Sequence, residues 1–173
     1  MPNLILIRNE YPDSAALLRV LNYVTRSGYI GGYALDPSFA YRQMTMTKNA
    51  YHKADGTQLL HYIISFSTAD ACRLTMDEMF SFGFWAARQL EDFQTIYALH
   101  SDTHHFHLHL ISNTVSFQDG HRYCGGLSFF WQLRNNLQQR FPRSDIGLFQ
   151  SFPRSSCNQY MEAEDRNEFL RIG

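Results

Sequence analysis

Histidines are concentrated in one short stretch of this chain, and their spacing suits a metal site. Five of the 8 histidines of the 173-residue sequence lie between residues 100 and 109. From Phe106 to Ile111 polar and apolar residues alternate, which predicts a strand with His107 and His109 on one face. Two imidazoles at positions i and i+2 lie about 6.6 Å apart along a strand. Both can therefore reach one metal ion at about 2.0–2.2 Å.

A third ligand must come from a neighbouring segment. His105 has the same parity as His107 and His109, but the outer rings of that trio would lie about 13 Å apart, too far for one ion. Residues 101–104 can turn the chain, so that His100 ends one strand and His107 lies on the next. We therefore expect His100, His107 and His109 to bind a divalent metal ion. The alternative interpretations are a solvated strand face and an adventitious metal site in a histidine-rich turn.

The same residues match a known motif. The pattern His100-x-Asp102-x4-His107-x-His109-x3-Asn113 resembles the third motif of conjugative relaxases of the MobA type. These enzymes are HUH endonucleases, a superfamily named for a His-hydrophobic-His pair. His104 and His105 exceed what the motif needs, and either is an exposed turn residue or an alternative ligand.

Two further motifs of this family are found in the expected order. The first is a helix that ends in a tyrosine followed by a β-branched residue and threonine, which Tyr23-Val24-Thr25 resembles. The second is a hydrophobic strand running into Ser65-Phe66, with the acidic Asp70 downstream. The resemblance covers about residues 1–125. The glycine-rich segment 28–32 departs from the charged loop that these enzymes have.

The resemblance implies metal-dependent nicking and rejoining of DNA. Tyr23 would attack the scissile phosphate and form a 5′-phosphotyrosine. Mg²⁺ or Mn²⁺ is the ion expected for the family, although an all-nitrogen site intrinsically prefers Zn²⁺ or Ni²⁺. Asp102 would orient a histidine or cap the turn after His100. Ser65 would bond a DNA phosphate or pack at a strand end, and Asn113 would hold a loop or contact the site.

The implied partner is single-stranded DNA at an origin of transfer, with relaxosome accessory proteins and a type IV secretion coupling protein as further partners.

Two other functions remain open. A rolling-circle replication initiator would place its tyrosine after the histidines, where Tyr123 and Tyr160 lie. A non-cleaving accessory DNA-binding domain would have the same fold but would not cleave DNA. Near Tyr23, the alternative nucleophiles are Tyr29, Tyr33 and Tyr41.

The net charge is unusual for a DNA enzyme, because the chain has 15 Lys and Arg against 16 Asp and Glu. The acidic residues dominate only the middle third, so basic residues of the flanking thirds, among them Arg26 and Lys48, either line a DNA groove or are solvated surface charges. The three cysteines have no CxxC spacing and indicate a reducing compartment. No apolar run approaches the roughly 20 residues of a membrane helix. We expect a bacterial cytoplasmic location without membrane contact.

The elements expected around these motifs indicate an α+β fold. We expect strands at residues 4–8, 59–67, 95–99 and 106–115, and helices at about 14–26, 75–91 and 128–141, with Ser128 as the cap of the last one. Residues 28–57 contain several breakers and predict loops and short irregular elements. We predict a two-layer sandwich, mainly an antiparallel sheet with helices packed on one side, the palm-like fold that the resemblance implies. Residues 1–173 would form a single catalytic domain, with the motifs in about 1–125 and a helical and irregular part in 126–173.

Overall fold

The computed structural model describes residues 2–101, 105–143, 145–153 and 167–171, with side chains up to residue 150. Within these ranges the strands form a seven-stranded sheet with the order β2-β4-β5-β3-β1-β6-β7. All neighbouring strands are antiparallel except β1 and β6. The strands are β1 (Asn3–Ile7), β2 (Tyr29–Tyr33), β3 (Leu59–Phe66), β4 (Thr95–His100), β5 (Phe106–Asn113), β6 (Gly147–Pro153) and β7 (Asn167–Arg171).

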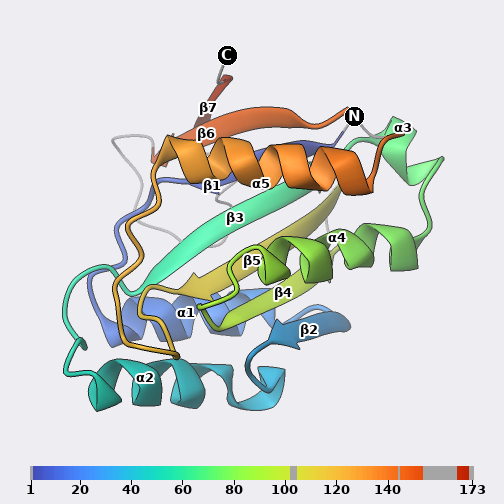
Figure 1. The fold of residues 1–173 in the computed structure, drawn as a ribbon. Helices are drawn as coiled ribbons and strands as arrows, with labels where there is room; N and C mark the ends of the chain where they lie inside the picture. The colour runs from blue at the N-terminus through green and yellow to red at the C-terminus, as the bar shows by residue number, and fades with distance from the viewer. Residues whose placement is uncertain (1, 102–104, 144, 154–166, 172–173) are drawn as a thin grey trace.

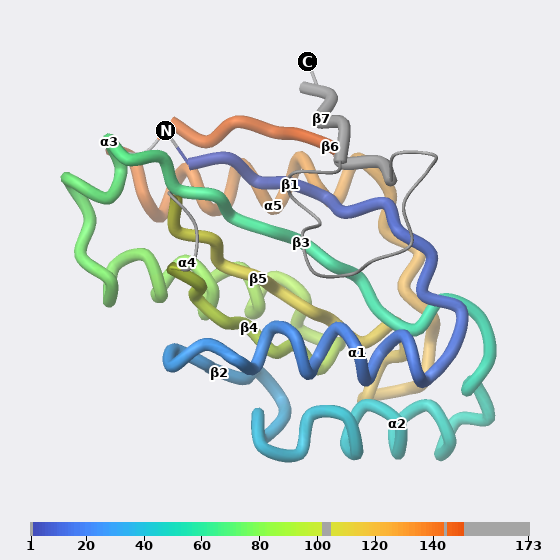
Figure 2. Tube along the Cα trace, turned by 180° about the vertical axis from the view of Figure 1, so that it is seen from behind, coloured from blue at the N-terminus to red at the C-terminus, as the bar shows by residue number. Residues whose placement is uncertain are grey.

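Helices lie against both faces of the sheet. Helices α4 (Met76–Arg88) and α5 (Leu127–Arg140) cover the face that carries Leu108 and Leu110, where they form the larger hydrophobic core (Figure 1). Seen from behind, α1 (Ser14–Val24) and α2 (Ala40–Ala50) belong to the other face, near the β2 edge of the sheet (Figure 2). The predicted α+β class with a mainly antiparallel sheet is confirmed, but the helices are not confined to one side, because α1 and α2 pack on the other face. The short elements are the 3₁₀ helix η1 (Pro37–Phe39) and α3 (Thr68–Ala71).

The second core explains why α1 and α2 lie where they do. Its buried residues come from α1, α2 and the strand positions that face away from α4 and α5. These residues include Leu17, Leu21, Val24, Met44, Ile96, Ala98 and Ile111. Leu17 is fully buried in this core, whereas Leu18 is 39% exposed. The boundary between the core-facing and the solvent-facing side of α1 therefore passes between these two consecutive residues.

Segment 28–57 is more regular than its sequence predicts, because it contains β2 and α2. Gly31 and Gly32, which we expected to break structure, lie within β2. Gly31 is paired with Tyr97 of β4, and a Cβ on Gly31 would lie only 2.3 Å from the Tyr97 ring. The ring thus occupies the space that a side chain would take, and the glycine is required by that packing.

Local sequence signals set the helix starts in two cases and fail in a third. Asp13 accepts a hydrogen bond from the Ala16 amide at the start of α1. Thr75 and Glu78 form a capping box at the start of α4. Helix α5 begins at Leu127 with Gly126 as its N-cap and no side-chain cap, so the prediction of Ser128 as its cap is wrong. Beyond α5, β6 and β7 extend the sheet.

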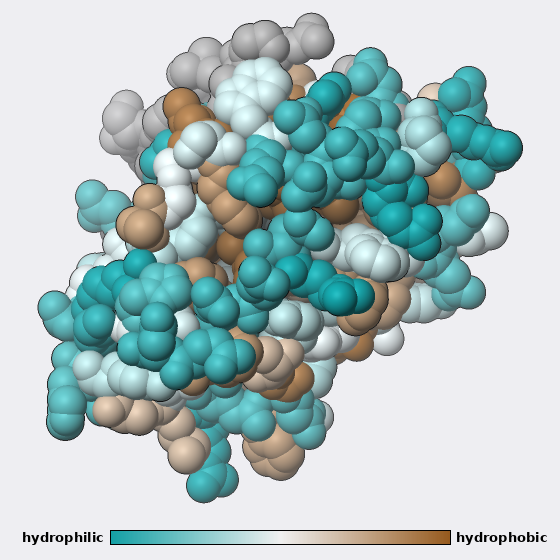
Figure 3. All heavy atoms as spheres, viewed as in Figure 1, coloured by the Kyte–Doolittle hydropathy of each residue, from teal (hydrophilic) through white to brown (hydrophobic). Residues whose placement is uncertain are grey.

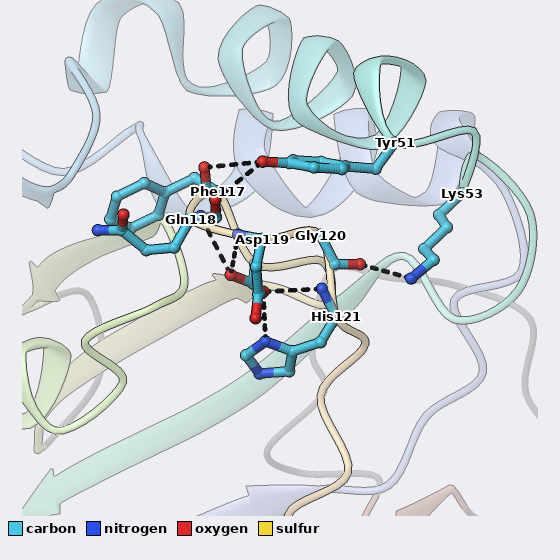
Figure 4. A network of polar contacts seen from close by, with 8 residues as sticks. Tyr51, Lys53, Phe117, Gln118, Asp119, Gly120 and His121 are labelled. Atoms are coloured by element: carbon cyan, nitrogen blue, oxygen red, sulfur yellow. Dashed lines mark hydrogen bonds and ion pairs between the residues drawn. The ribbon is translucent and has the colours of Figure 1, made fainter.

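The end of α2 is fixed to the turn that follows β5. The Tyr51 hydroxyl donates to the Gln118 carbonyl at 3.0 Å, and Lys53 donates to the Gly120 carbonyl at 2.6 Å (Figure 4). Asp119 accepts from the His121 ring at 2.6 Å within the same turn. These bonds link the helix layer of one face to the strand that carries the histidine pair.

Lys48 of α2 does not lie on the surface, where we expected it to line a DNA groove. Its side chain is 1% exposed, and Nζ has no hydrogen-bond partner among the described residues. Burial, together with the charge of Arg122, lowers the Lys48 pKa to about 8. A charged ammonium at this position therefore destabilises the folded protein.

The outer surface of the α4–α5 side is mainly hydrophilic. In Figure 3 hydrophilic side chains cover most of the face in view, with small hydrophobic areas between them. In the described parts of the chain, no helix is long and apolar enough to cross a membrane.

The packing of α4 on β4 gives a first prediction. A Cβ on Gly83 would lie 2.5 Å from the Tyr97 ring, so Gly83→Ala should lower the free energy of unfolding by about 1–2 kcal/mol. This loss would occur although alanine favours helices by about 1 kcal/mol over glycine. Urea denaturation measures it. Gly28→Ala, where no heavy atom lies within 4 Å of the added Cβ, is the control and should change stability by less than about 0.5 kcal/mol. A Gly83→Ala protein as stable as wild type would contradict the packing.

The burial of Lys48 gives a second prediction. Because its folded pKa is below the ordinary 10.5, the unfolded chain binds more protons between pH 8 and 10.5, and stability should rise with pH in that window. Lys48→Met removes the buried charge and should raise the free energy of unfolding at pH 7 by about 1–3 kcal/mol. The gain should shrink as the pH approaches 10. Urea denaturation at pH 7 and 9.5 tests both points.

Lys53→Met is the matched control for this substitution. It removes a satisfied hydrogen bond to the Gly120 carbonyl and should destabilise the protein at both pH values. A Lys48→Met protein that is less stable than wild type at pH 7 would show that the ammonium has a stabilising partner.

Candidate active site on the histidine face

The strand register brings the predicted histidines together. His100 at the end of β4 is paired with His107 of β5, as the turn between them predicts. Residues paired across antiparallel strands point to the same side of the sheet. His109 therefore shares this side with His107, and so does Ser65, which is paired with His107 from β3. We call this side of the sheet, which carries His61, His100, His107 and His109, the histidine face. All four rings are buried.

The C-terminus of α1 is docked on β4 beside these rings. The Val24 carbonyl accepts a hydrogen bond from His100 Nε2 at 2.9 Å, which satisfies one of the carbonyls that a helix end leaves without a partner. The Ser27 hydroxyl donates to the Leu99 carbonyl. Thr25 closes the helix, since its hydroxyl donates to the Leu21 carbonyl at 2.8 Å. The last of these bonds gives a physical reason for the threonine of the Tyr-Val-Thr motif.

Tyr23 is thereby placed against the histidines. Its ring centroid lies 5.3 Å from that of His100 and 5.6 Å from that of His109, and the ring is only half-buried. The other tyrosines considered nearby have different surroundings. The Tyr33 hydroxyl donates to the Glu91 carbonyl, and Tyr29 packs against Phe80. Tyr41 belongs to the edge of the core under α1.

Sequence reasoning missed two residues of this site, His61 and Tyr11. His61 of β3 bonds through Nε2 to His109 Nδ1 at 3.0 Å, and through Nδ1 to the Tyr11 hydroxyl at 3.1 Å. The available signal was the parity of β3, because His61 has the same parity as Ser65 and must point to the same face. Tyr11 had no signal, since it lies in the segment before α1 and meets His61 only in the fold.

Two of the buried imidazoles, those of His61 and His109, are held neutral by a lowered pKa. Burial lowers the pKa of His61, and the neighbouring His100 lowers it further. Burial likewise lowers the pKa of His109, with His61, His100 and His107 acting in the same direction. Neutral imidazole is the form that binds metal ions.

The donor chemistry of the face fits a divalent metal ion. The bond to Val24 occupies Nε2 of His100, and the bond to His61 occupies Nδ1 of His109. Each ring then keeps its second nitrogen for a ligand bond, and the two ring centroids lie 4.6 Å apart. Within the described ranges, however, no three His, Cys, Asp or Glu side chains are already arranged to hold an ion. Ligation by His100, His107 and His109 together therefore stays a prediction.

The remaining predicted residues lie in different surroundings. Arg26 is exposed, just beyond the end of α1. Asn113 is fully buried at the far end of β5, where its amide donates to the Met44 carbonyl at 3.2 Å and to Gln94 at 3.1 Å. It thus ties α2 to the sheet. Asp102 and His104 lie outside the described residues, while His105 is exposed, with its ring centroid 6.3 Å from that of His107.

Comparisons with known proteins match the part of the chain that carries this site. A family model described as "Relaxase: MobA/VirD2-like, nuclease domain" matches residues 22–139. Protein rlx of Staphylococcus aureus is 29% identical over 107 residues, which are 61% of this chain and 32% of that protein. The chain thus spans about a third of the length of this relative. No solved structure matches. Because the family match covers more than half of the chain, with Tyr23 and the clustered histidines inside it, the chain belongs to the MobA/VirD2-like relaxases and carries their nuclease domain.

Proposed function

We propose that this chain nicks one strand of DNA at an origin of transfer and rejoins it, and so starts the mobilisation of a plasmid or integrative element. The observation that carries the proposal is the position of Tyr23, whose ring lies against His100 and His109 at the docked end of α1. Membership of a family of relaxase nucleases supports it.

In this reaction the Tyr23 hydroxyl is the nucleophile. Its oxygen forms a bond to phosphorus while the bond from phosphorus to the 3′-oxygen breaks. The phenolic proton leaves Tyr23, and the released strand gains a 3′-hydroxyl. The 5′-phosphotyrosine keeps the energy of the phosphodiester, so attack by a 3′-hydroxyl can reseal the strand. The docking of α1 on β4 holds the tyrosine in place for both steps.

His100, His107 and His109 would hold the divalent ion. When bound, such an ion offers positive charge to the oxygens of the scissile phosphate. We expect Mg²⁺ or Mn²⁺ in use, while the all-nitrogen donor set also suits Zn²⁺ and Ni²⁺. Asp102 is proposed to orient one of these histidines.

The proposed DNA contacts lie around the same face. Arg26 is exposed beside Tyr23 and is suited to a phosphate, and the Ser65 hydroxyl lies beside His107 in the register. Longer relatives such as protein rlx leave room for further domains. Relaxosome accessory proteins and a type IV secretion coupling protein are the further partners that we propose.

A rolling-circle initiator is the closest alternative, and the structure gives it less support. Its tyrosine would be Tyr123 or Tyr160. Tyr123 bonds to the Tyr62 hydroxyl at 3.1 Å, and Tyr62 points to the sheet face opposite the histidines. Tyr160 lies outside the described residues. A non-cleaving DNA-binding domain is distinguished from our proposal by the experiment below.

The proposal predicts a covalent adduct that depends on Tyr23. Labelled single-stranded oligonucleotides from candidate origins of transfer, incubated with Mn²⁺, should give a protein–DNA band on denaturing gels. Tyr23→Phe should lower adduct formation by more than about 10³-fold, because it removes the nucleophile. His107→Ala should lower it by about 100-fold or more.

Tyr29→Phe is the matched control, since it removes an exposed phenol close to Tyr23 in sequence and should leave the adduct unchanged. An adduct that survives Tyr23→Phe would assign the nucleophile to another residue. Binding without any adduct, across a broad library of origins, would favour the non-cleaving domain.

A further inference from the structure

A buried chain of three side chains lies behind the proposed metal ligands. It runs from the Tyr11 hydroxyl to His61 Nδ1, at 3.1 Å, and from His61 Nε2 to His109 Nδ1, at 3.0 Å. Its members come from the segment before α1, from β3 and from β5, and none is more than 6% exposed. The proposed reaction gives His61 and Tyr11 no role, so the presence of a second buried imidazole here needs a reason.

His61 is not placed as a metal ligand. Both of its ring nitrogens are already occupied, one by Tyr11 and the other by His109. His109 differs, because only its Nδ1 is engaged by His61 and Nε2 remains for a ligand bond. The series of hydrogen bonds therefore ends at Nδ1 of His109, and Nε2 of that ring takes no part in it.

The direction of these hydrogen bonds decides whether His109 can bind a metal ion. A neutral imidazole carries its proton on one nitrogen and a lone pair on the other. If His109 donates from Nδ1, its Nε2 keeps the lone pair that a ligand needs. If His61 donates instead, the proton of His109 is on Nε2 and blocks that nitrogen. Only the first direction is compatible with metal binding. It makes His61 an acceptor at Nε2 and a donor at Nδ1, with the Tyr11 oxygen as acceptor.

We propose that Tyr11 and His61 are positioning residues, which fix the tautomer and ring plane of His109 so that its Nε2 is presented to the divalent ion. This inference rests on the proposed function for the identity of the metal ligands. A metal-binding histidine typically donates its second N–H to a protein acceptor, and loss of that acceptor costs about 10–100-fold in metal affinity.

Tyr11 matters because it accepts the proton on Nδ1 of His61. Without the hydroxyl, a buried Nδ1–H would have no acceptor, and an unsatisfied buried N–H is costly. His61 would then shift to the tautomer with its proton on Nε2 and would donate to His109. His100 has a simpler arrangement, since the Val24 carbonyl can only accept and so fixes its donor nitrogen without help.

The test measures Mn²⁺ affinity by isothermal titration calorimetry on the whole chain without DNA. His61→Leu removes the acceptor and should weaken Mn²⁺ binding by about 10–100-fold. His61→Gln keeps an acceptor oxygen and donor protons on one side chain, and should restore the affinity to within about fivefold of wild type. Tyr11→Phe should weaken binding by about 10-fold. Tyr123→Phe, which removes a phenol bonded only on the opposite face, is the matched control and should leave the affinity unchanged.

A second measurement reads the tautomer directly and does not depend on metal or activity. Long-range ¹H–¹⁵N spectra of the metal-free protein should show the His109 proton on Nδ1 in wild type and on Nε2 in Tyr11→Phe. A wild-type His109 with its proton on Nε2 would overturn the inference. So would His61→Leu and Tyr11→Phe proteins that bind Mn²⁺ as tightly as wild type. If His61→Leu fails to fold, Tyr11→Phe decides by both measurements.

The outcomes separate this inference from the proposed function. The variants could change the His109 tautomer and the Mn²⁺ affinity although the wild type never forms a DNA adduct. This result would support the positioning role and contradict the proposed nicking activity. Suppose instead that the wild type forms the adduct, while Tyr11→Phe and His61→Leu leave the His109 tautomer and the Mn²⁺ affinity unchanged. The nicking activity would then stand and the positioning role would be wrong.

Discussion

The hydrogen bond from His100 to the Val24 carbonyl is the contact on which the rest of the site depends. It joins the last residue of α1 to the last residue of β4, and so places Tyr23, one position earlier, against the histidine rings. The same bond fixes the donor nitrogen of His100. A helix end always leaves carbonyls that need donors, and here that requirement both docks the helix and orients a proposed ligand.

The opposite face of β4 makes this docking rigid. Tyr97 lies between Gly31 of β2 and Gly83 of α4, and both glycines leave the space that its ring fills. The strand is therefore fixed from one side by an aromatic ring that two glycines accommodate, and from the other by the apolar side of α1. Since His100 ends this strand, displacement of β4 would move the proposed ligand and the proposed nucleophile together.

The sequence predicts those parts of the molecule that depend on near neighbours. Alternation reveals β5, a capping box reveals α4, and the short connection between His100 and His107 predicts their pairing. Prediction from the sequence fails where the residue that determines the structure is distant in the chain. The glycines of β2 predict a loop, because the sequence does not show that Gly31 packs against the Tyr97 ring. His61 likewise bonds to two partners that lie about fifty residues away on either side in the sequence. The burial of Lys48 depends likewise on the packing of α2, which its own segment does not show.

The near-neutral charge of the chain is compatible with the proposed metal site. Neutral imidazoles contribute no charge of their own, so the proposed ion would keep its full double charge for the phosphate. The protein then needs few cations near the reacting atoms, which is consistent with 15 basic residues against 16 acidic ones. Arg26, which we propose to bind a flanking phosphate, is exposed just beyond the end of α1, whereas Lys48 is buried without a partner among the described residues. In the proposed arrangement the bound ion would supply the charge at the scissile phosphate, and the hydrogen bonds behind the histidines would determine whether the ion can bind.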